Sequence, residues 1–427
     1  GSIHQALDDN SLAKAAEALR EAQVGSLAIV FLHSYRNDSH ERTAGDRMAE
    51  LLPDIAISLS SDVAPEIREF ERASTTVANA YIKPLARDYL DALGSRLGDR
   101  AITAPLLLML SSGGLTHVGE VRRSPVQMLE SGPAAGALAA ADIGRAEGLE
   151  HVLAFDMGGT TAKLCLIDGD EPDIAYRFEA ARERRFAEGS GLPIRISTVE
   201  LIEIGAGGGS IARIDALGLL KAGPDSAGAV PGPVAYGRGG TAPTVTDADF
   251  ALGFLGAEGF AGGAIEVDLA ATRDALEKLA EQADLSAEKI AWGVHDLVNE
   301  NMASAARVHI AEKGRDPRAY TLVATGGAGP VHAYYMARKL GIKRIVCPRN
   351  AGVASAFGLL LAPARVDRTA AFASSLDEMD WSTLESTYQE LEAAARQVIA
   401  DTGMDADAAK VQRLADMRNV GQGFELV

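Results

Sequence analysis

The sequence predicts an α/β protein in which one helix–strand arrangement occurs twice. Three observations support this fold class. Short apolar segments of strand length alternate along the chain with longer segments of helical periodicity. The order helix–strand–helix–strand–helix can be read in both halves, which indicates a duplication. Two glycine-rich turns, at Gly158 and Gly326, each follow an apolar strand directly.

The first half opens with a helix at residues 11–23, where apolar residues recur at helical spacing. The polar residues at its start are candidate N-caps: Asp9, Asn10 and Ser11. The next segment, 26–32, is almost wholly apolar and therefore predicts a buried strand. The elements expected after it are helix 39–52, strand 55–59, helix 74–97, strand 104–110 and a mostly helical segment 125–147.

The second half repeats this order and adds strands in front of it. The expected elements are a three-strand meander at 152–155, 162–167 and 173–178, helices 269–283 and 288–313, strand 321–324, helix 331–340, strand 344–347 and a helix after Gly352. The first copy is expected to lack such a meander. The expected domains are a truncated first copy at 1–148, a second copy at 149–370 and the start of a C-terminal domain at 371–427.

Residues 156–161, Asp-Met-Gly-Gly-Thr-Thr, suit a phosphate-binding hairpin. The preceding strand delivers the Asp156 carboxylate to its end, where it can hold a metal ion or the surrounding water. Gly158 and Gly159 let the chain reverse tightly and leave backbone N–H groups free to face an anion. The hydroxyls of Thr160 and Thr161 can donate to phosphate oxygens. An ordinary glycine-containing hairpin turn is the alternative.

The second turn is Gly326-Gly-Ala-Gly329, with Pro330 near the first position of the helix that follows. A strand, a glycine turn and a helix N-terminus allow a nucleotide to lie against bare backbone. Together the two turns resemble the phosphate and adenosine motifs of the actin, heat-shock chaperone and sugar-kinase superfamily. In that superfamily, duplicated ribonuclease-H-like domains close over ATP.

Five longer stretches resemble the hydantoinase A/5-oxoprolinase family, which includes the large subunits of acetone and acetophenone carboxylases. They are 65–76 (PEIREFERASTT), 131–136 (SGPAAG), 202–212 (IEIGAGGGSIA), 230–249 (VPGPVAYGRGGTAPTVTDAD) and 413–423 (RLADMRNVGQG). The resemblance implies duplicated ribonuclease-H-like domains, the first lacking its N-terminal phosphate-binding meander. Family members begin with another D-x-G-G-T hairpin that this sequence does not contain. We therefore expect an internal fragment that alone binds ATP poorly and turns over little.

The resemblance also implies an activity. ATP would phosphorylate the oxygen of a cyclic amide such as hydantoin, N-methylhydantoin or 5-oxoproline, and the ring would then open by hydrolysis. Ketone carboxylation with ATP and bicarbonate is the implied alternative. A non-catalytic scaffold switched by a nucleotide is an alternative of another class. A small-molecule kinase of the same fold would not be expected to carry the stretches 205–210 and 231–249.

By the same resemblance, ATP and Mg²⁺ are the expected cofactors and a B-type second subunit is the expected partner. The residues that would hold phosphate and Mg²⁺ are Asp156, Gly158, Gly159, Thr160 and Thr161. Those that would flank the adenosine are Gly326, Gly327 and Gly329.

The Gly- and Pro-rich stretch 205–246 is the longest expected departure from regular structure, and loops of this length are usually functional or disordered. Its residues Gly207, Gly208 and Gly209 could form a nest of N–H groups for phosphate. A hinge between two lobes is the alternative. Glu203, just before this loop, could act as a base or a metal ligand, or be a solvated strand residue.

Asp247 and Asp249 follow the loop. Asp247 could bind a cation through its carboxylate. Asp249 is more readily the N-cap of a helix that begins near Phe250. His309 lies on a predicted helix and His332 at the start of another. Such a histidine can serve as a neutral donor, although a structural role is commoner.

Composition limits the remaining classes of protein. The net charge of −18 argues against nucleic-acid binding, because no basic stripe faces a phosphate backbone. No apolar run approaches the roughly 18 residues needed to cross a membrane. Cys165 and Cys347 are isolated thiols without a disulfide framework. A cytoplasmic protein without a membrane or nucleic-acid partner is therefore expected.

Overall fold

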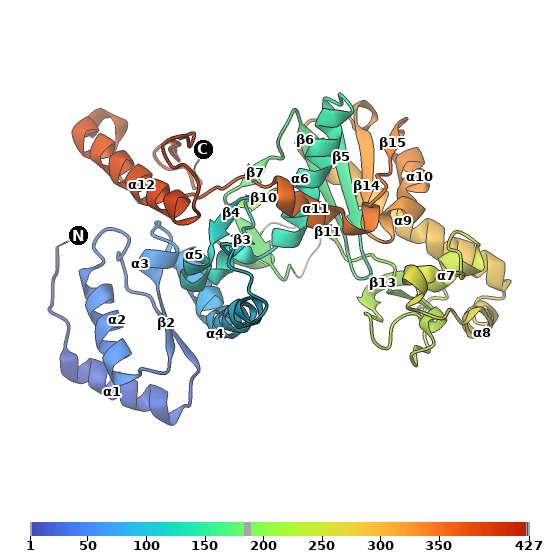
Figure 1. Cartoon of the computed structure of the whole chain (residues 1–427), viewed down its shortest axis with the longest axis horizontal. Coiled ribbons are helices and arrows are strands. Elements are labelled where there is room, and N and C mark those ends of the chain that lie inside the picture. The colour runs from blue at the N-terminus through green and yellow to red at the C-terminus, as the bar shows by residue number, and fades with distance from the viewer. Residues whose placement is uncertain (1, 183–188, 424, 426–427) are drawn as a thin grey trace. The chain divides into compact units, whose positions relative to one another are not determined.

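The computed structural model describes residues 2–182, 189–423 and 425, and it shows a mixed α/β protein (Figure 1). The chain forms two compact units, each built from segments that are distant in sequence. Unit 1 comprises Gly1–Ser131, Ala175–Thr198 and Pro363–Val427, and unit 2 comprises Gly132–Ile174 and Val199–Ala362.

Unit 1 contains small two-stranded sheets and several helices. Its elements are α1 (Asp9–Glu21), β1 (Ser26–Ile29), α2 (Ser39–Leu51), β2 (Ala56–Leu59), α3 (Ser60–Val63), α4 (Glu69–Asp99), β3 (Leu107–Met109), β4 (Leu115–His117), α5 (Val118–Arg123), η1 (Pro125–Met128), β8 (Phe178–Ala180), β9 (Leu192–Ile194), η6 (Leu376–Glu378) and α12 (Trp381–Asp401). β1 and β2 are parallel, whereas β3–β4 and β8–β9 are antiparallel pairs. A hydrophobic core beneath α1 and α2 includes the buried residues Ala16, Ile29 and Met48.

Two details of unit 1 differ from expectation. The N-cap of α1 is Asp8, whose carboxylate accepts the N–H groups of Asn10 and Ser11, so the three residues proposed as caps lie within the first turn of the helix. α4 begins at Glu69 and is 31 residues long, which extends the expected helix at both ends. The duplication of a ribonuclease-H-like fold stays a prediction.

Unit 2 is organised around one five-stranded sheet. Its elements are α6 (Ser131–Ala146), β5 (His151–Met157), β6 (Ala162–Asp168), β11 (Ile202–Ile204), β12 (Ser210–Ile214), β13 (Leu220–Ser226), η2 (Val234–Tyr236), α7 (Val245–Ala251), η3 (Phe260–Gly263), α8 (Leu269–Glu281), α9 (Ala287–Glu312), η4 (Pro317–Ala319), β14 (Thr321–Thr325), α10 (Gly329–Leu340), β15 (Ile345–Val346), η5 (Ala351–Val353) and α11 (Ala354–Leu361). The strand order is β11-β6-β5-β14-β15. β6 is antiparallel to β5 and β11, and β14 is parallel to β5 and β15.

The predicted meander is correct for β5 and β6 and wrong for its third strand. The strand beside β6 is β11, whose Glu203 lies opposite Lys163. The segment expected there forms the short β7 (Ile174–Ala175), which pairs with β10 (Thr198–Val199). The long loop expected at 205–246 also contains regular structure, because β12 and β13 form an antiparallel hairpin within it.

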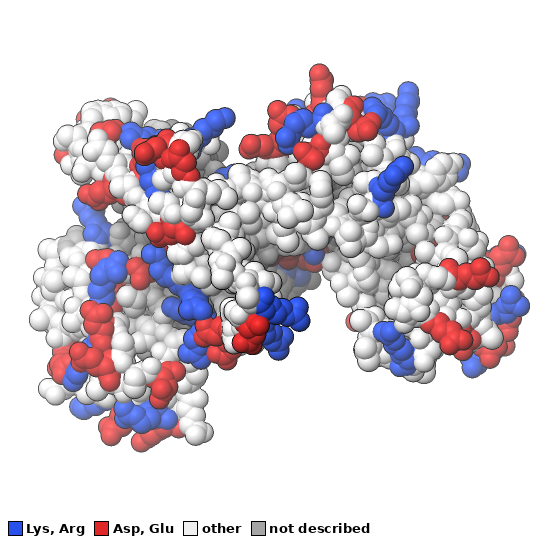
Figure 2. Space-filling view, in the orientation of Figure 1, with Lys and Arg blue, Asp and Glu red and all other residues white. Residues whose placement is uncertain are grey.

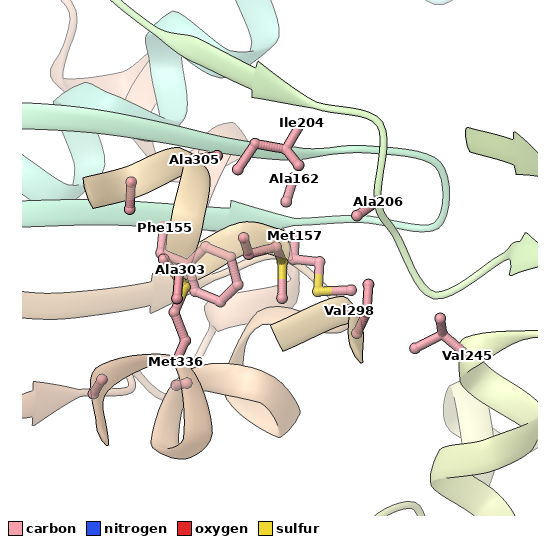
Figure 3. Close-up of a cluster of buried hydrophobic side chains, with 14 of the residues drawn as sticks. Phe155, Met157, Ala162, Ile204, Ala206, Val245, Val298, Ala303, Ala305 and Met336 are labelled. Atoms are coloured by element: carbon pink, nitrogen blue, oxygen red, sulfur yellow. The ribbon is translucent and has the colours of Figure 1, made fainter. Parts of the chain in front are cut away.

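Side chains of β5 point alternately to the two faces of the sheet, and this separates the hydrophobic core from the candidate site. Phe155 and Met157 are fully buried and join Val298 of α9 and Met336 of α10 in one hydrophobic cluster (Figure 3). Because successive side chains of a strand point to opposite faces, Asp156 projects away from this cluster.

The helix α6 lies within unit 2, although its residues were expected in the first domain. A Cβ added to Gly144 of α6 would lie 2.8 Å from Val152 Cγ2 of β5, so small residues allow a close approach. Cys165 is buried in β6 as expected, whereas Cys347, after β15, is exposed.

Acidic and basic side chains are interspersed over the face of the molecule in Figure 2. Among the helices that the structure describes, none is both long enough and apolar enough to span a bilayer.

Candidate functional site

The two glycine turns are neighbours at one edge of the unit 2 sheet. β5 and β14 run in parallel with Asp156 opposite Thr325, so the turns that follow them emerge side by side. The N–H of Ala328 donates to the carbonyl of Met157 over 3.0 Å. A Cβ on Gly326 would collide with Asp156 Oδ1 and with the Met157 backbone. Glycine is therefore required for the two turns to pack together.

Part of the hairpin after β5 is open to solvent. The N–H of Gly158 donates to the carbonyl of Thr161 over 3.1 Å and closes the turn, so this N–H is not free to face an anion as the sequence had suggested. Gly159 and Thr160 are exposed, and a Cβ on Gly159 would meet nothing within 4 Å. Gly327, in the second turn, is also exposed and faces open space. These positions leave backbone accessible to a ligand.

The loop Gly207–Gly209 packs underneath the hairpin. The N–H groups of Gly208 and Gly209 donate to the carbonyls of Gly158 and Gly159 over 3.0 and 2.6 Å, and that of Gly207 donates to Ser210 Oγ. These donors are used inside the protein, so they do not form the open phosphate nest that the sequence suggested. All three glycines are buried, which indicates that they support the hairpin from below.

The Asp156 carboxylate is half-buried at the point where the turns meet. Burial raises its pKa, and this effect outweighs the hydrogen bond from Ser355 and the nearby Lys163 ammonium, which both favour the charged form. Ser355 Oγ lies 3.2 Å from Asp156 Oδ2. A hollow of about 10 Å³, enough for one water molecule, is lined by Asp156, Lys163 and Thr325. A carboxylate in this position is suited to hold a cation.

Glu203 belongs to the same row of residues across the sheet. Lys163 lies opposite Asp156 on one side and opposite Glu203 on the other. Its Nζ is 3.1 Å from Glu203 Oε1 and 3.2 Å from Thr161 Oγ1. The Glu203 side chain is 52% exposed. Sequence reasoning missed Lys163, although its place on β6, two residues after Thr161 of the hairpin turn, was a usable signal.

Asp247 is buried and fully engaged with the protein. Its carboxylate accepts the N–H groups of Val234, Ala235 and Thr244 and the hydroxyl of Thr244. These four donors account for the buried carboxylate without a cation. Burial still raises its pKa, against the effect of the hydrogen bonds. Its role as a metal ligand stays a prediction.

The capping role expected of Asp249 was wrong. Thr244 is the N-cap of α7, and Thr244 with Asp247 forms a capping box. Asp249 lies inside the helix and contacts His295 and His332. On the same helix, the N–H and hydroxyl of Thr246 donate to the carbonyl of Gly208 over 2.7 and 2.8 Å, which ties α7 to the glycine loop.

Comparisons with known proteins agree with this architecture. A family model described as hydantoinase/oxoprolinase matches residues 72–368, and one described as the hydantoinase/oxoprolinase N-terminal region matches residues 1–52. An uncharacterized protein of Methanocaldococcus jannaschii is 39% identical over 430 residues, covering 100% of this chain and 62% of its own length. The alpha subunit of caprolactamase from Pseudomonas jessenii is 35% identical over 429 residues, covering 100% of this chain and 60% of its own length.

Two solved structures are similar over nearly the whole chain. The crystal structure of the ATP-dependent caprolactamase from Pseudomonas jessenii matches with a TM-score of 0.79 and 34% identity, over 100% of this chain and 61% of that one. Nucleotide-free acetone carboxylase matches with a TM-score of 0.78 and 28% identity, over 98% of this chain and 60% of that one. The chain thus spans about 60% of the length of these relatives. Together the matches show that the chain belongs to the hydantoinase/oxoprolinase family.

Proposed function

We propose that unit 2 carries part of an ATP site with which the complete protein activates a cyclic amide for hydrolysis. The adjacency of the Asp156 hairpin and the Gly326 turn is the observation that carries this proposal. Two turns with accessible backbone at one sheet edge can hold two parts of the same nucleotide. The similarity to a solved structure of an ATP-dependent caprolactamase supports the choice of substrate class.

In this proposal the hairpin binds the phosphates and the second turn flanks the adenosine. Thr160 and Thr161 donate their hydroxyls, Gly159 contributes accessible backbone, and Gly158 closes the turn that presents them. Gly326 and Gly327 lie just before α10 and Gly329 is its first residue, so a nucleotide can lie against bare backbone there. Gly207, Gly208 and Gly209 contribute indirectly, by holding the hairpin from below.

Asp156 is the proposed Mg²⁺ ligand. The fit is chemically reasonable, because Mg²⁺ in nucleotide sites takes one or two carboxylates together with waters and phosphate oxygens. Asp156 offers one carboxylate beside a water-sized hollow. When bound, Mg²⁺ would neutralise charge on the phosphates.

The chemistry follows from the poor reactivity of an amide. The amide oxygen attacks the γ-phosphorus, ADP leaves, and the amide N–H gives up its proton. The resulting O-phosphorylated carbon is a better electrophile. Water adds to it, the ring C–N bond breaks, and a second water hydrolyses the acyl phosphate. Phosphoryl transfer requires mainly alignment and charge stabilisation, which the glycine turns and their threonines can supply.

Glu203 is the proposed base for the attacking water. Its exposed carboxylate is held by Lys163, which also contacts Thr161 of the hairpin. This links the base to the phosphate-binding turn through one side chain.

The test uses the complete polypeptide with its second subunit. ATP hydrolysis is measured with hydantoin, 5-oxoproline, caprolactam, or acetone plus bicarbonate, alongside the ring-opened or carboxylated product. We expect stimulation by a cyclic amide, and loss of it in Asp156→Asn but not in the exposed control Asp274→Asn. Stimulation by acetone and bicarbonate alone would favour a ketone carboxylase. ATP binding without turnover on any substrate would favour a nucleotide-switched scaffold.

A further inference from the structure

Three polar side chains meet in the interior of unit 2, beneath the first turns of α10. They are Asp249 of α7, His295 of α9 and His332 of α10, and their side chains are 0–2% exposed. One candidate ligand atom from each lies within 4.8 Å of the others. The two imidazole rings are stacked, with centroids 4.7 Å apart and planes 18° from parallel. Buried polar groups of this kind require partners, because unpaired ones are costly.

Asn299 determines which ring nitrogen of His332 carries a proton. Asn299 Nδ2 donates to the His295 carbonyl over 2.8 Å, and the opposite orientation would bring two acceptor oxygens together. Asn299 Oδ1 therefore faces His332 Nδ1, at 3.2 Å. An oxygen acceptor at this distance requires a proton on Nδ1.

The other nitrogen of His332 then faces a carboxylate. Nε2 lies 3.2 Å from Asp249 Oδ2, the distance of an ion pair, although it is not aligned as a good hydrogen bond. If His332 were neutral, an unprotonated nitrogen would meet a negatively charged oxygen in a buried site. A cation must therefore lie between them, and it is either a proton or a metal ion.

The arrangement favours the proton. His295 Nδ1 lies 2.7 Å from Asp249 Oδ1 and His332 Nε2 lies 3.2 Å from Asp249 Oδ2, so one carboxylate faces both stacked rings. A proton on His332 and a charge on Asp249 sum to zero. A divalent metal with one carboxylate would instead leave a net positive charge among Phe254, Tyr335 and Trp292, whose rings contact His295. The cluster also supplies three ligands, one fewer than a closed zinc site uses.

We propose that His332 is an imidazolium paired with Asp249, and that this pair positions α7 against α10. The consequence for ligand binding rests on the proposed nucleotide site. Thr246, three residues before Asp249, anchors the glycine loop, and Gly329, three residues before His332, ends the second turn. The pair thus connects α7, which anchors the glycine loop under the hairpin, with α10, which begins at the second turn. Burial opposes the charged form of Asp249, but the two imidazoles together hold its pKa below its ordinary value.

The isosteric variant Asp249→Asn gives the sharpest test. Its carboxamide can accept from His295 and donate to an unprotonated His332 Nε2, so it can keep both contacts of the carboxylate and the protein should fold. We expect ¹⁵N NMR of histidine-labelled protein to show both His332 nitrogens protonated at neutral pH in the native chain. Only Nδ1 should be protonated in Asp249→Asn. His309, whose pKa burial lowers, should be neutral in both proteins and serves as the internal reference.

A neutral His332 in the native chain, or an imidazolium that persists in Asp249→Asn, would overturn the ion pair. Stoichiometric metal retained after chelation would overturn it as well.

The positioning role is tested by Mg-ATP titration. Asp249→Ala should weaken binding at least tenfold, and Asp249→Asn should restore it to within threefold of the native value. Native-like binding by folded Asp249→Ala would refute positioning. If the native chain binds no nucleotide in the complete protein, the proposed function fails, while NMR still decides the ion pair.

Discussion

Replacing Gly326 by alanine tests the packing of the two turns directly. Gly326 has φ +82°, a left-handed conformation that costs a non-glycine residue about 1–2 kcal/mol. Its Cβ would also collide with Asp156 Oδ1 and lie 2.7 Å from the Met157 carbonyl carbon. Forcing backbone apart in a packed region costs about 1–3 kcal/mol more. The expected loss of unfolding free energy is therefore about 2–5 kcal/mol.

Two other glycines serve as matched controls. Gly314 has φ +66°, and its Cβ would meet nothing within 4 Å, so Gly314→Ala should show the conformational cost of about 1–2 kcal/mol alone. Gly327 lies beside Gly326 but faces open space. Gly327→Ala should change stability by less than about 0.5 kcal/mol. If a nucleotide lies over this turn, the same variant should weaken its binding.

The assay is denaturant unfolding of the three variants, followed by titration of Mg-ATP into the complete protein carrying each substitution that folds. The packing argument requires Gly326→Ala to be less stable than Gly314→Ala by about 1–3 kcal/mol. Equal stabilities would show that the two turns are not in contact as described. Unchanged binding by Gly327→Ala would remove that turn from the ligand site.

Three further substitutions test individual contacts. Because burial raises the pKa of Asp156, ionising it costs stability at neutral pH, so Asp156→Asn should raise the thermal midpoint at pH 7. That gain should vanish as the pH falls below the ordinary carboxyl pKa of about 3.9, and Mg-ATP binding should weaken at least tenfold, or about 1.4 kcal/mol. Asp247→Asn places an amide NH₂ group among backbone N–H donors, so the free energy of unfolding, measured with denaturant, should fall by about 1–3 kcal/mol. Added Mg²⁺ should not change that difference. A difference that widens with Mg²⁺ would instead identify Asp247 as a metal ligand, because only the native carboxylate would gain stability from binding the ion. Thr246→Val removes one of two donors to the Gly208 carbonyl and should cost about 0.5–1.5 kcal/mol, and no loss of stability would show that the hydroxyl does not anchor the loop.

Local patterns predicted the long elements well. Helix α9 was expected at 288–313 and is observed at Ala287–Glu312, because its apolar periodicity extends over seven turns. The strands before both glycine turns were also expected where β5 and β14 lie. The sequence order of those strands did not show that they pair in parallel, since that pairing joins residues about 170 positions apart.

The misses have physical causes. β11 is three residues long, and although Glu203 was considered a possible strand residue, no local signal indicated that its segment pairs with β6. The capping box of Thr244 and Asp247 was readable from its spacing, but the aspartate had been weighed as a cation ligand. The contact of Asp249 with His295 joins residues 46 positions apart and leaves no local signal.

The reactivity of the two cysteines can be used to measure local unfolding of β6 in the native chain. Cys347 is exposed, whereas Cys165 is 2% exposed in the middle of β6, and burial raises the pKa of its thiol. An alkylating reagent should therefore modify Cys347 first and reach Cys165 only when β6 separates from its neighbours. The rate of that second, slow modification measures how often the strand pair carrying the Asp156 hairpin comes apart. A compound that slows it stabilises this strand pair, whether or not any product forms.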